Sequence, residues 1–367
     1  MALDVAHFGH DRPGRPPVVV GLGTCNALGT TPHQTWAFRR AEVTAFVGSP
    51  FRLPSGNALT FARVRQLDPL SIGGERLVSL AHRALDPVGE LLARVPTRAR
   101  LGIVLCLPER ADPARGEERG RHLRRRLETT VIGPFVERGH DVLARVVARG
   151  HASFGYAAVE AGRMLEERRL DVALLIGVDG WYDPFLLETL FEQKRVLDSE
   201  WREAFVPGEA ATAVLLARPD VARELGFEAL AALDSAATNE EVATAFDDVP
   251  STGHGLSRPA VAIAKRLAKE GRGVDWWLCD VTGESFRVHE LQLAWPRASH
   301  LVMTPEASLE LLPTHLGDIG AATMPTAAAI GIEGLRRRDP PGSVVLVSGS
   351  SAGGDRGVVA FTVCGAS

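Results

Sequence analysis

The chain has 367 residues, of which 45% are hydrophobic and 23% are charged, and its formal net charge is −4. This apolar fraction is large enough to form a core, which excludes wholesale disorder. The near-balanced charge excludes the basic surplus with which dedicated nucleic-acid-binding proteins neutralise phosphates. No apolar run approaches the ~18 residues of a membrane span, and residues 1–17 lack the apolar segment of a secretory signal. We therefore expect a soluble cytoplasmic protein that binds neither membranes nor nucleic acids.

The cysteines are isolated from one another and predict neither a metal site nor a disulfide framework. They are Cys25, Cys106, Cys279 and Cys364. None belongs to a CxxC pair or has a histidine at metal-ligand spacing, so we expect no metal and interpret all four as inert structural thiols. The short motif at residues 21–23, Gly-Leu-Gly, lacks the third glycine of a dinucleotide fingerprint, so we expect no nucleotide cofactor.

Short β-branched runs alternate with helix-compatible segments in the first half of the chain. Buried strands are predicted at residues 18–20, 102–105, 171–178 and 210–216. The alanine-rich stretch 155–168 predicts a helix immediately before the third of these strands. Residues 115–126 are rich in arginine, but the glutamates among them favour a solvated helix over a polyanion-binding patch. Apolar strands that alternate with helices indicate an α/β protein whose sheet is covered on both faces.

The same pattern begins again after about residue 225. Strands are predicted at residues 227–234 and 275–281, and helices at 257–271 and 320–337. Pro325 must then lie in the first turns of the last helix. Residues 344–347 and 357–363 predict a hairpin that closes across a glycine-rich loop. On the second strand, alternation places the rings of Trp276 and Trp277 in opposite layers. Two α/β units of similar plan are therefore expected.

Five motifs, in the same order as in the family, resemble the β-ketoacyl synthases of the thiolase-like superfamily. They correspond to the family's opening strand, the strand after its nucleophile helix, its Phe-Val-x-Gly-Glu-Gly turn, its Ile-Gly-His segment and its closing glycine-rich loop. In this chain they are VVVGLGTCNALG at 18–29, DVALLIGVD at 171–179, FVPGEA at 205–210, LGDIGAA at 316–322, and the segment 348–361. The resemblance spans residues 17–363, nearly the whole chain.

The resemblance implies a five-layer α-β-α-β-α fold made of two related halves. It divides the chain into an N-terminal extension at 1–16, an N-terminal half at 17–222 and a C-terminal half at 223–367. Relatives of this family are usually dimers, commonly through strands near the nucleophile. The implied partners are a second copy of the chain or an active ketosynthase, with an acyl carrier protein as a further partner.

The catalytic side chains of the family are replaced at the matching positions. Condensation uses a cysteine at a helix N-terminus, whose thiolate accepts the acyl group, and two histidines. Counting back from Asp171 places His151 at the position of the cysteine. Asp280 and Asp318 occupy the positions of the two histidines, and Pro313 replaces the lysine that usually precedes the second. The resemblance thus implies the fold of a condensing enzyme without its thiolate chemistry.

Three functions are compatible with these replacements. In the first, the chain is a non-condensing partner subunit comparable to a chain-length factor. In the second, it is an altered acyl-thioester hydrolase or acyltransferase that uses His151 with Asp280 and Asp318. Alternatively, it binds an acyl or pantetheine group without turnover. A metal held by the three replacements is a variant of the second function. The family positions that would line the substrate pocket are Phe154, Thr282, Ala352 and Gly353, with the small Ala352 leaving the tunnel more open.

Two further histidines lie near these segments in the sequence. His289 follows the turn that contains Asp280, and His315 precedes Asp318 by three residues. Either could turn into the site, but the more common role of such residues is on a loop surface or capping backbone groups.

Overall fold

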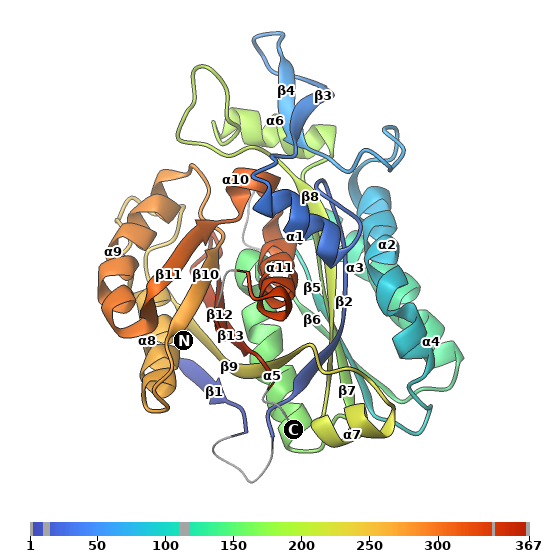
Figure 1. The fold of residues 1–367 in the computed structure, drawn as a ribbon. Helices are drawn as coiled ribbons and strands as arrows, with labels where there is room; N and C mark the ends of the chain where they lie inside the picture. Colours follow the sequence, from blue (N-terminus) through green and yellow to red (C-terminus); the bar gives the residue numbers. More distant parts are fainter. Residues whose placement is uncertain (1–2, 10–14, 110–116, 340–341, 365–367) are drawn as a thin grey trace.

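The computed structural model describes residues 3–9, 15–109, 117–339 and 342–364, and within them eleven strands form one hydrogen-bonded sheet (Figure 1). Five strands come from the N-terminal part of the chain: β2 (Val18–Asn26), β5 (Leu101–Cys106), β6 (Val142–Val147), β7 (Val172–Gly180) and β8 (Glu209–Ala217). Five come from the C-terminal part: β9 (Ala231–Glu240), β10 (Val274–Cys279), β11 (Met303–Leu311), β12 (Val344–Ser350) and β13 (Asp355–Thr362). The short β1 (Asp4–His7) pairs antiparallel with β9 over residues 235–238.

The two sets of five strands have the same topology. Across the sheet the order is β11-β10-β12-β13-β9 and then β2-β8-β7-β5-β6. The five strands of each half can be numbered 1 to 5 in chain order. From the outer edge of the sheet to the junction, both halves then have the strand order 3-2-4-5-1. The halves join where β2 meets β9, and only two residue pairs are in register there, Val18 with Ala232 and Val19 with Ala231. The repeated order supports the expectation of two related halves.

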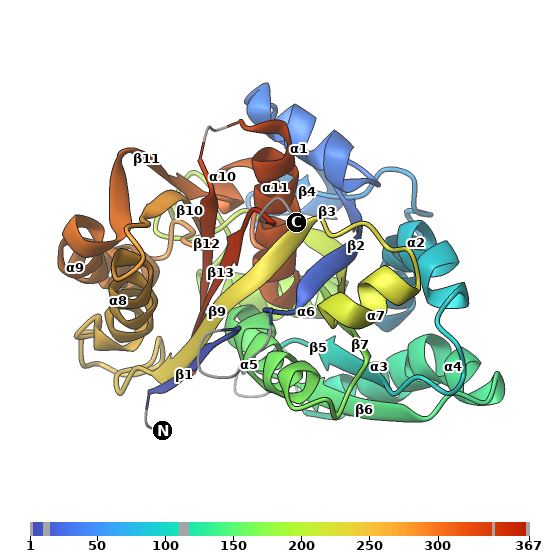
Figure 2. The same ribbon diagram turned by 60° about the horizontal axis from the view of Figure 1, so that its bottom comes forward.

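Helices cover both faces of each half sheet and form three layers (Figures 1 and 2). The central layer contains α1 (Pro32–Arg40), α5 (Ser153–Glu166) and α11 (Thr323–Arg337), whose apolar residues share one core with both half sheets. The outer layer of the N-terminal half contains α2 (Gly73–Ala93), α3 (Glu117–Leu127) and α4 (Gly133–Glu137), and that of the C-terminal half contains α8 (His254–Ala268) and α9 (Ser285–Val302). The architecture is therefore the five-layer α-β-α-β-α fold.

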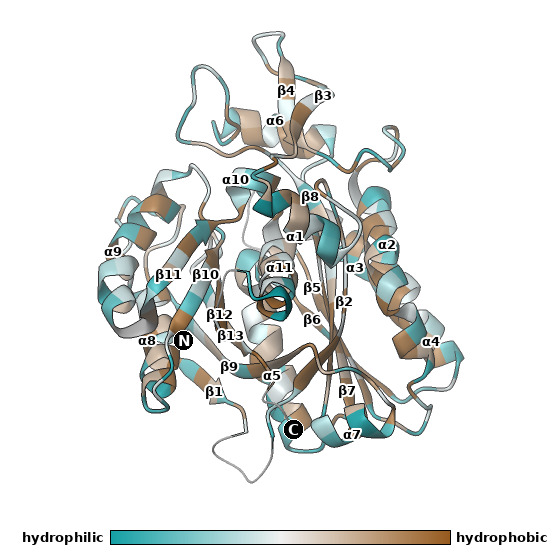
Figure 3. Cartoon of the chain, viewed as in Figure 1, coloured by the Kyte–Doolittle hydropathy of each residue, from teal (hydrophilic) through white to brown (hydrophobic). Residues whose placement is uncertain are grey.

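The alternation of side chains along the strands produces these layers. On β7, Leu174 and Ile176 pack towards the outer helices, whereas Leu175 between them packs towards the central layer. Trp276 faces the central core and Trp277 the outer core, which confirms the prediction for this pair. The interior strands are predominantly hydrophobic, while α2 and α9 carry residues of both kinds (Figure 3).

A small subdomain sits at one end of the sheet, at the top of Figure 1. It is built from the hairpin of β3 (Phe46–Arg52) and β4 (Ala58–Ala62) and from α6 (Pro184–Glu192). Asp183 caps α6 by accepting a hydrogen bond from the Phe185 N–H, and Pro184 occupies the first turn, where its missing N–H costs nothing. The remaining short elements are α7 (Pro219–Glu224), α10 (Pro313–Leu316), the π-helical turn η1 (Glu128–Ile132), and the 3₁₀ turns η2 (Gly150–Ala152) and η3 (Gly320–Ala322).

Most of the elements predicted from the sequence are present. The terminal hairpin forms as β12 and β13, and Pro325 lies in the first turn of α11. The strand predicted from residue 227 begins only at Ala231, because the preceding residues turn out of α7. The arginine-rich helix is α3, and Arg115, at the start of its predicted range, lies outside the described residues. No helix in the described part of the chain is long and apolar enough to cross a membrane.

Candidate functional site

The amino ends of α5 and α11 meet at the centre of the molecule, and each is preceded by a turn that begins with a glycine. Gly150 opens η2 with φ +53°, and Gly320 opens η3 with φ +51°, a region that favours glycine. At Gly320 a Cβ would also lie 1.9 Å from Asp179 Oδ2, the atom that accepts a hydrogen bond from the Ala321 N–H. These turns hold His151 of η2 and Asp318, just before η3, in facing positions.

His151 and Asp318 form a buried pair. His151 Nε2 lies 3.1 Å from Asp318 Oδ1, and the same oxygen accepts a hydrogen bond from the Gly320 N–H at 2.8 Å. Burial alone would raise the pKa of Asp318, but His151, Arg287 and the Gly320 N–H outweigh it and hold the pKa well below its ordinary value. Asp318 is therefore a carboxylate, and its Oδ2 has no hydrogen-bond partner among the described residues.

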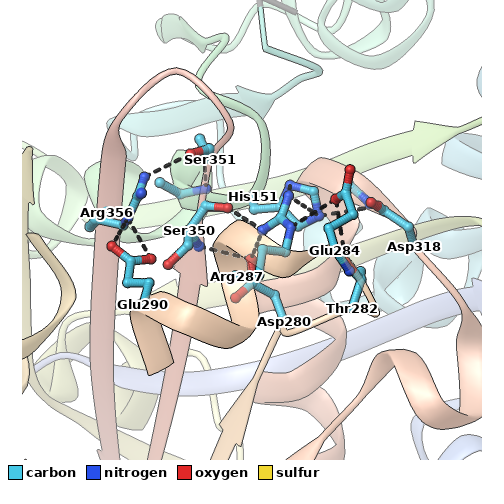
Figure 4. A network of polar contacts seen from close by, with 12 residues as sticks. His151, Asp280, Thr282, Glu284, Arg287, Glu290, Asp318, Ser350, Ser351 and Arg356 are labelled. Atoms are coloured by element: carbon cyan, nitrogen blue, oxygen red, sulfur yellow. Dashed lines mark hydrogen bonds and ion pairs between the residues drawn. The ribbon is translucent and has the colours of Figure 1, made fainter. Parts of the chain in front are cut away.

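Arg287 of α9 enters the space beside this pair (Figure 4). Its guanidinium donates to Asp280 Oδ2 at 2.8 Å, to Glu284 Oε2 at 3.2 Å and to the Ser350 carbonyl. Burial alone would lower the pKa of Arg287, but the carboxylates of Asp280, Glu284 and Asp318 raise it, so the group is a fixed cation. Only 1% of the side chain is exposed.

The guanidinium also contacts the imidazole of His151. Arg287 Nη2 lies 3.2 Å from His151 Nδ1 and 3.4 Å from its Nε2. A guanidinium can only donate hydrogen bonds, so the nearer nitrogen, Nδ1, is the acceptor. The tautomer that satisfies both neighbours carries its hydrogen on Nε2 and donates it to Asp318. In this arrangement both ring nitrogens already have a partner.

The two carboxylates that hold Arg287 each have a further hydrogen-bond partner. Glu284 Oε1 accepts from Arg195 Nε at 2.8 Å, so this carboxylate lies between two guanidinium groups. Asp280 Oδ2 accepts from the Ser350 N–H at 2.8 Å. Asp280 therefore contacts Arg287 and the backbone of β12. His151 and Asp318 form one pair at this site, and Arg287 connects His151 to Asp280.

Very little space remains beside these groups. The cavity has a volume of about 20 Å³. Its lining residues are Glu109, Gly150, His151, Asp179, Trp181, Arg195, Arg287, Gly320 and Ala352. A cavity needs at least about 10–15 Å³ to hold one water molecule, so this one has room for about one. Pockets that hold small organic ligands are typically about 300–1,000 Å³.

The four residues expected to line a substrate pocket do not line one common cavity. Ala352 lines the small cavity. Phe154 is 1% exposed and packs in the central core, with its ring centroid 6.5 Å from that of Phe361. Thr282 donates a hydrogen bond to Glu284 at 3.3 Å. Gly353 donates its N–H to Glu109 Oε1 at 2.7 Å and lines a different, outer groove.

The two other histidines considered from the sequence contact backbone carbonyls, and the cysteines do not line the site. His289 Nε2 lies 3.2 Å from the Ser251 carbonyl, and His315 Nδ1 lies 3.1 Å from the Val43 carbonyl. Burial raises the pKa of Cys25 to about 12, and it raises the pKa of the other three thiols as well. Three of these cysteines are fully buried, and none of the four lines the cavity beside His151. Among the described residues, no group of three His, Cys, Asp or Glu side chains is arranged to hold a metal.

The outer groove lies along the free edge of the sheet. It has a volume of about 850 Å³ and is lined by β6 and α5, with further residues from β1, β9 and β13. Within the described chain no strand pairs with the outer side of β6, whose only neighbour is β5. The charges of the groove are matched in pairs, such as Arg145 with Glu160 at 3.2 Å and Arg149 with Asp355. Tyr156 and Met164 of α5 add an aromatic and an apolar surface.

Arg287 and Glu284 are the main residues that reasoning from the sequence missed. Arg287 lies in the first turn of α9, and Glu284 is the N-cap residue just before this helix. The one signal available in the sequence was their spacing of three residues, in the segment that follows Asp280. On a helix this spacing brings two side chains together, as it does in the Glu284–Arg287 ion pair.

Solved structures share this architecture over nearly the whole chain. A chain of a complex described as a type II PKS acyl-carrier protein with its ketosynthase bound to the hexaketide has a TM-score of 0.76 at 14% identity, covering 96% of this chain and 100% of its own. The fold is that of the ketosynthases. The ishigamide ketosynthase/chain length factor has a TM-score of 0.74 at 18% identity, covering 96% of this chain and 100% of its own.

A ketosynthase from module 6 of the bacillaene synthase of Bacillus subtilis 168 has a TM-score of 0.72 at 12% identity, covering 95% of this chain and 72% of its own. No protein-family model matches the sequence, and no curated protein matches it. The chain thus has the ketosynthase-like thiolase fold, on a sequence that has diverged far from these structures.

Proposed function

We propose that this protein is a non-condensing ketosynthase-like subunit that acts with a partner protein in polyketide or fatty-acid-type biosynthesis. The observation that carries the proposal is the occupation of the central site by Arg287. Its guanidinium is held by two carboxylates and a backbone carbonyl, and about 20 Å³ remains free beside it. An acyl chain or a pantetheine arm does not fit in that volume.

The side chain at the nucleophile position supports the same proposal. Condensation by this fold begins when a thiolate accepts the acyl group, and His151 supplies no sulfur. Its two ring nitrogens are directed to Asp318 and Arg287. The site is therefore suited to holding the two halves of the molecule in one arrangement, and its contribution is to structure rather than to bond formation.

The surface that would receive a partner is the free edge of β6 with the adjoining groove. An unpaired edge strand presents backbone N–H and C=O groups that can pair with a strand of another chain. The groove beside it offers about 850 Å³ lined by β6 and α5. We assign this surface to a second ketosynthase-like chain, which is either another copy or an active ketosynthase. One of the similar structures is the ishigamide ketosynthase/chain length factor, and another contains an acyl-carrier protein with its ketosynthase. We therefore include a carrier protein as a second partner.

Co-expression with a cysteine-containing ketosynthase from the same genome, followed by light scattering, tests this proposal. We expect a stable two-chain complex and no condensing activity from this chain alone. Arg145→Glu reverses a charge beside Glu160 at the edge strand and should weaken the complex. Arg258→Glu, on the exposed surface of α8, is the matched control and should leave it intact. Recovery of monomers only, or of equal complex with both variants, would count against the proposed surface.

A second candidate function rests on the buried His151–Asp318 pair. A carboxylate that holds an imidazole in one tautomer is a feature of general bases, and the cavity has room for about one water molecule. Such an acyl-thioester hydrolase or acyltransferase would also require Arg287 to move and make room for the acyl group. Turnover of acyl-thioesters that is lost in His151→Ala would favour this candidate over the non-condensing subunit. Equal rates in the wild type and this variant would exclude it.

A further inference from the structure

A separate cavity of about 520 Å³ lies where β2 begins, beside α7 and the end of the chain that follows β13. Its lining residues are Arg15, Pro16, Val18, Pro219, Ala222, Arg223, Phe227, Ala229, Ala232 and Cys364. None of these described residues also lines the cavity beside His151 or the groove along β6. Its volume falls within the range of cavities that hold small organic ligands.

The walls of this cavity are mainly apolar. Val18 and Ala232 come from the junction of β2 and β9, and Ala222 and Phe227 come from α7 and the turn that follows it. These four side chains are only 4–8% exposed, so they form a floor beneath the opening. These side chains have little surface of their own left in water, so the gain comes from the ligand: a hydrocarbon group that entered the cavity would remove its own apolar surface from water, which is favourable.

The charged groups that line the cavity are two arginines. Arg15 and Arg223 carry one positive charge each, and no aspartate or glutamate is among the described lining residues. The acidic neighbours of Arg223 on α7 are engaged elsewhere: Asp220 is 2.7 Å from Arg218, and Glu224 is 3.3 Å from Arg98. Within the described residues, neither lining arginine forms a side-chain hydrogen bond or ion pair. Among its described lining residues, the cavity thus combines an apolar floor with two solvent-exposed guanidinium groups that have no partner in the protein.

We propose that this cavity is a binding site for an aliphatic carboxylate. The hydrocarbon chain would lie against Val18, Ala222 and Ala232 of the floor, beside the Phe227 ring, over which the Arg94 guanidinium already lies at 4.8 Å from the centroid. The carboxylate would accept hydrogen bonds from Arg223 and Arg15. The planar guanidinium matches a carboxylate with two parallel hydrogen bonds, which gives this head group an advantage over a neutral one. The proposal does not depend on the partner function, because the residues that carry it are separate from β6 and from the His151 site.

Cys364 provides a direct readout, because it lies in the wall of this cavity. It is the partly exposed cysteine, whereas Cys25, Cys106 and Cys279 are buried. Labelling of the native full-length chain with a maleimide, followed by mass spectrometry, should therefore modify Cys364 first. We expect saturating dodecanoate, kept below its micellar concentration, to slow this labelling at least tenfold. Calorimetric titration of dodecanoate into the same protein provides a second measurement that does not depend on the thiol.

The controls distinguish the contribution of the ligand's head group to binding from that of its hydrocarbon chain. Arg223→Gln should weaken dodecanoate binding about tenfold or more, while Arg258→Gln on α8 should not change it. Acetate, which has the head group without the chain, should not protect Cys364. Equal protection by dodecyltrimethylammonium would overturn the proposal, because the arginines would then contribute nothing. Stronger binding of dodecyl phosphate would overturn the choice of a carboxylate, and the absence of dodecanoate binding by both methods would overturn the site itself.

Discussion

Replacing Arg287 with methionine should destabilise the protein strongly, because methionine fills much of the space but removes the cation. Asp280 would then be buried without an ion-pair partner, and Glu284 would keep only Arg195. Breaking a buried ion pair by removing one partner typically costs about 3–5 kcal/mol. With an unfolding entropy of about 2.1 cal/mol/K per residue, a chain of 367 residues should lose about 4–6 °C in Tm.

Two further variants distinguish the charge from simple packing. Asp280→Asn in the Arg287→Met background removes the isolated charge and should recover part of the lost stability. Arg356→Met is the matched control, because Arg356 is equally buried and lies 2.6 Å from Glu290, away from His151. It should cost a similar amount without recovery by Asp280→Asn. If Arg287→Met were as stable as the wild type at neutral pH, or if the double variant recovered nothing, our account of the site would be refuted.

Two other variants test the centre of the molecule. Gly155→Ala should destabilise the chain by about 1–3 kcal/mol, because the new Cβ would lie 2.7 Å from the Gly357 Cα. The control is Gly89→Ala, which has open space around it in α2 and should be neutral or stabilising. Equal Tm values for the two variants would contradict this packing argument. Because the pKa of Asp318 is lowered on folding, its contribution to stability is present above its ordinary pKa and is lost as the pH falls. Urea unfolding from pH 6 to pH 2 should thus show a shallower acid decline for Asp318→Asn, and parallel curves would contradict this assignment.

The sequence predicted the fold well because its strands are short, apolar and β-branched, and because family motifs lie at their ends. The terminal hairpin is an example, because the mainly apolar segments Val344–Val347 and Gly357–Val363 lie on either side of a glycine-rich loop. The helix α9 was not predicted. Residues 285–302 have only a weak apolar stripe, and Pro296 lies within them.

The content of the central site could be predicted only in part. Matching the family motifs indicated that His151, Asp280 and Asp318 lie together, and the structure does bring His151 and Asp318 within 3.1 Å. It could not indicate that Arg287 enters between them, because that depends on the tilt of α9 and on which way one long side chain turns. Arg287 also lies outside the five motifs, so matching them gave no information about it.

The narrow contact between β2 and β9 has a consequence for how the molecule holds together. With two residue pairs in register at that junction, the backbone contributes little to joining the halves. The cohesion comes instead from α5 and α11, whose small residues let the helices and the strands approach closely, as at Gly155 and Gly357. The protein is in this respect an intramolecular dimer with a covalent tether between α7 and β9. The polar cluster around Arg287 joins residues of both halves, so a change there should alter how the two halves pack against each other.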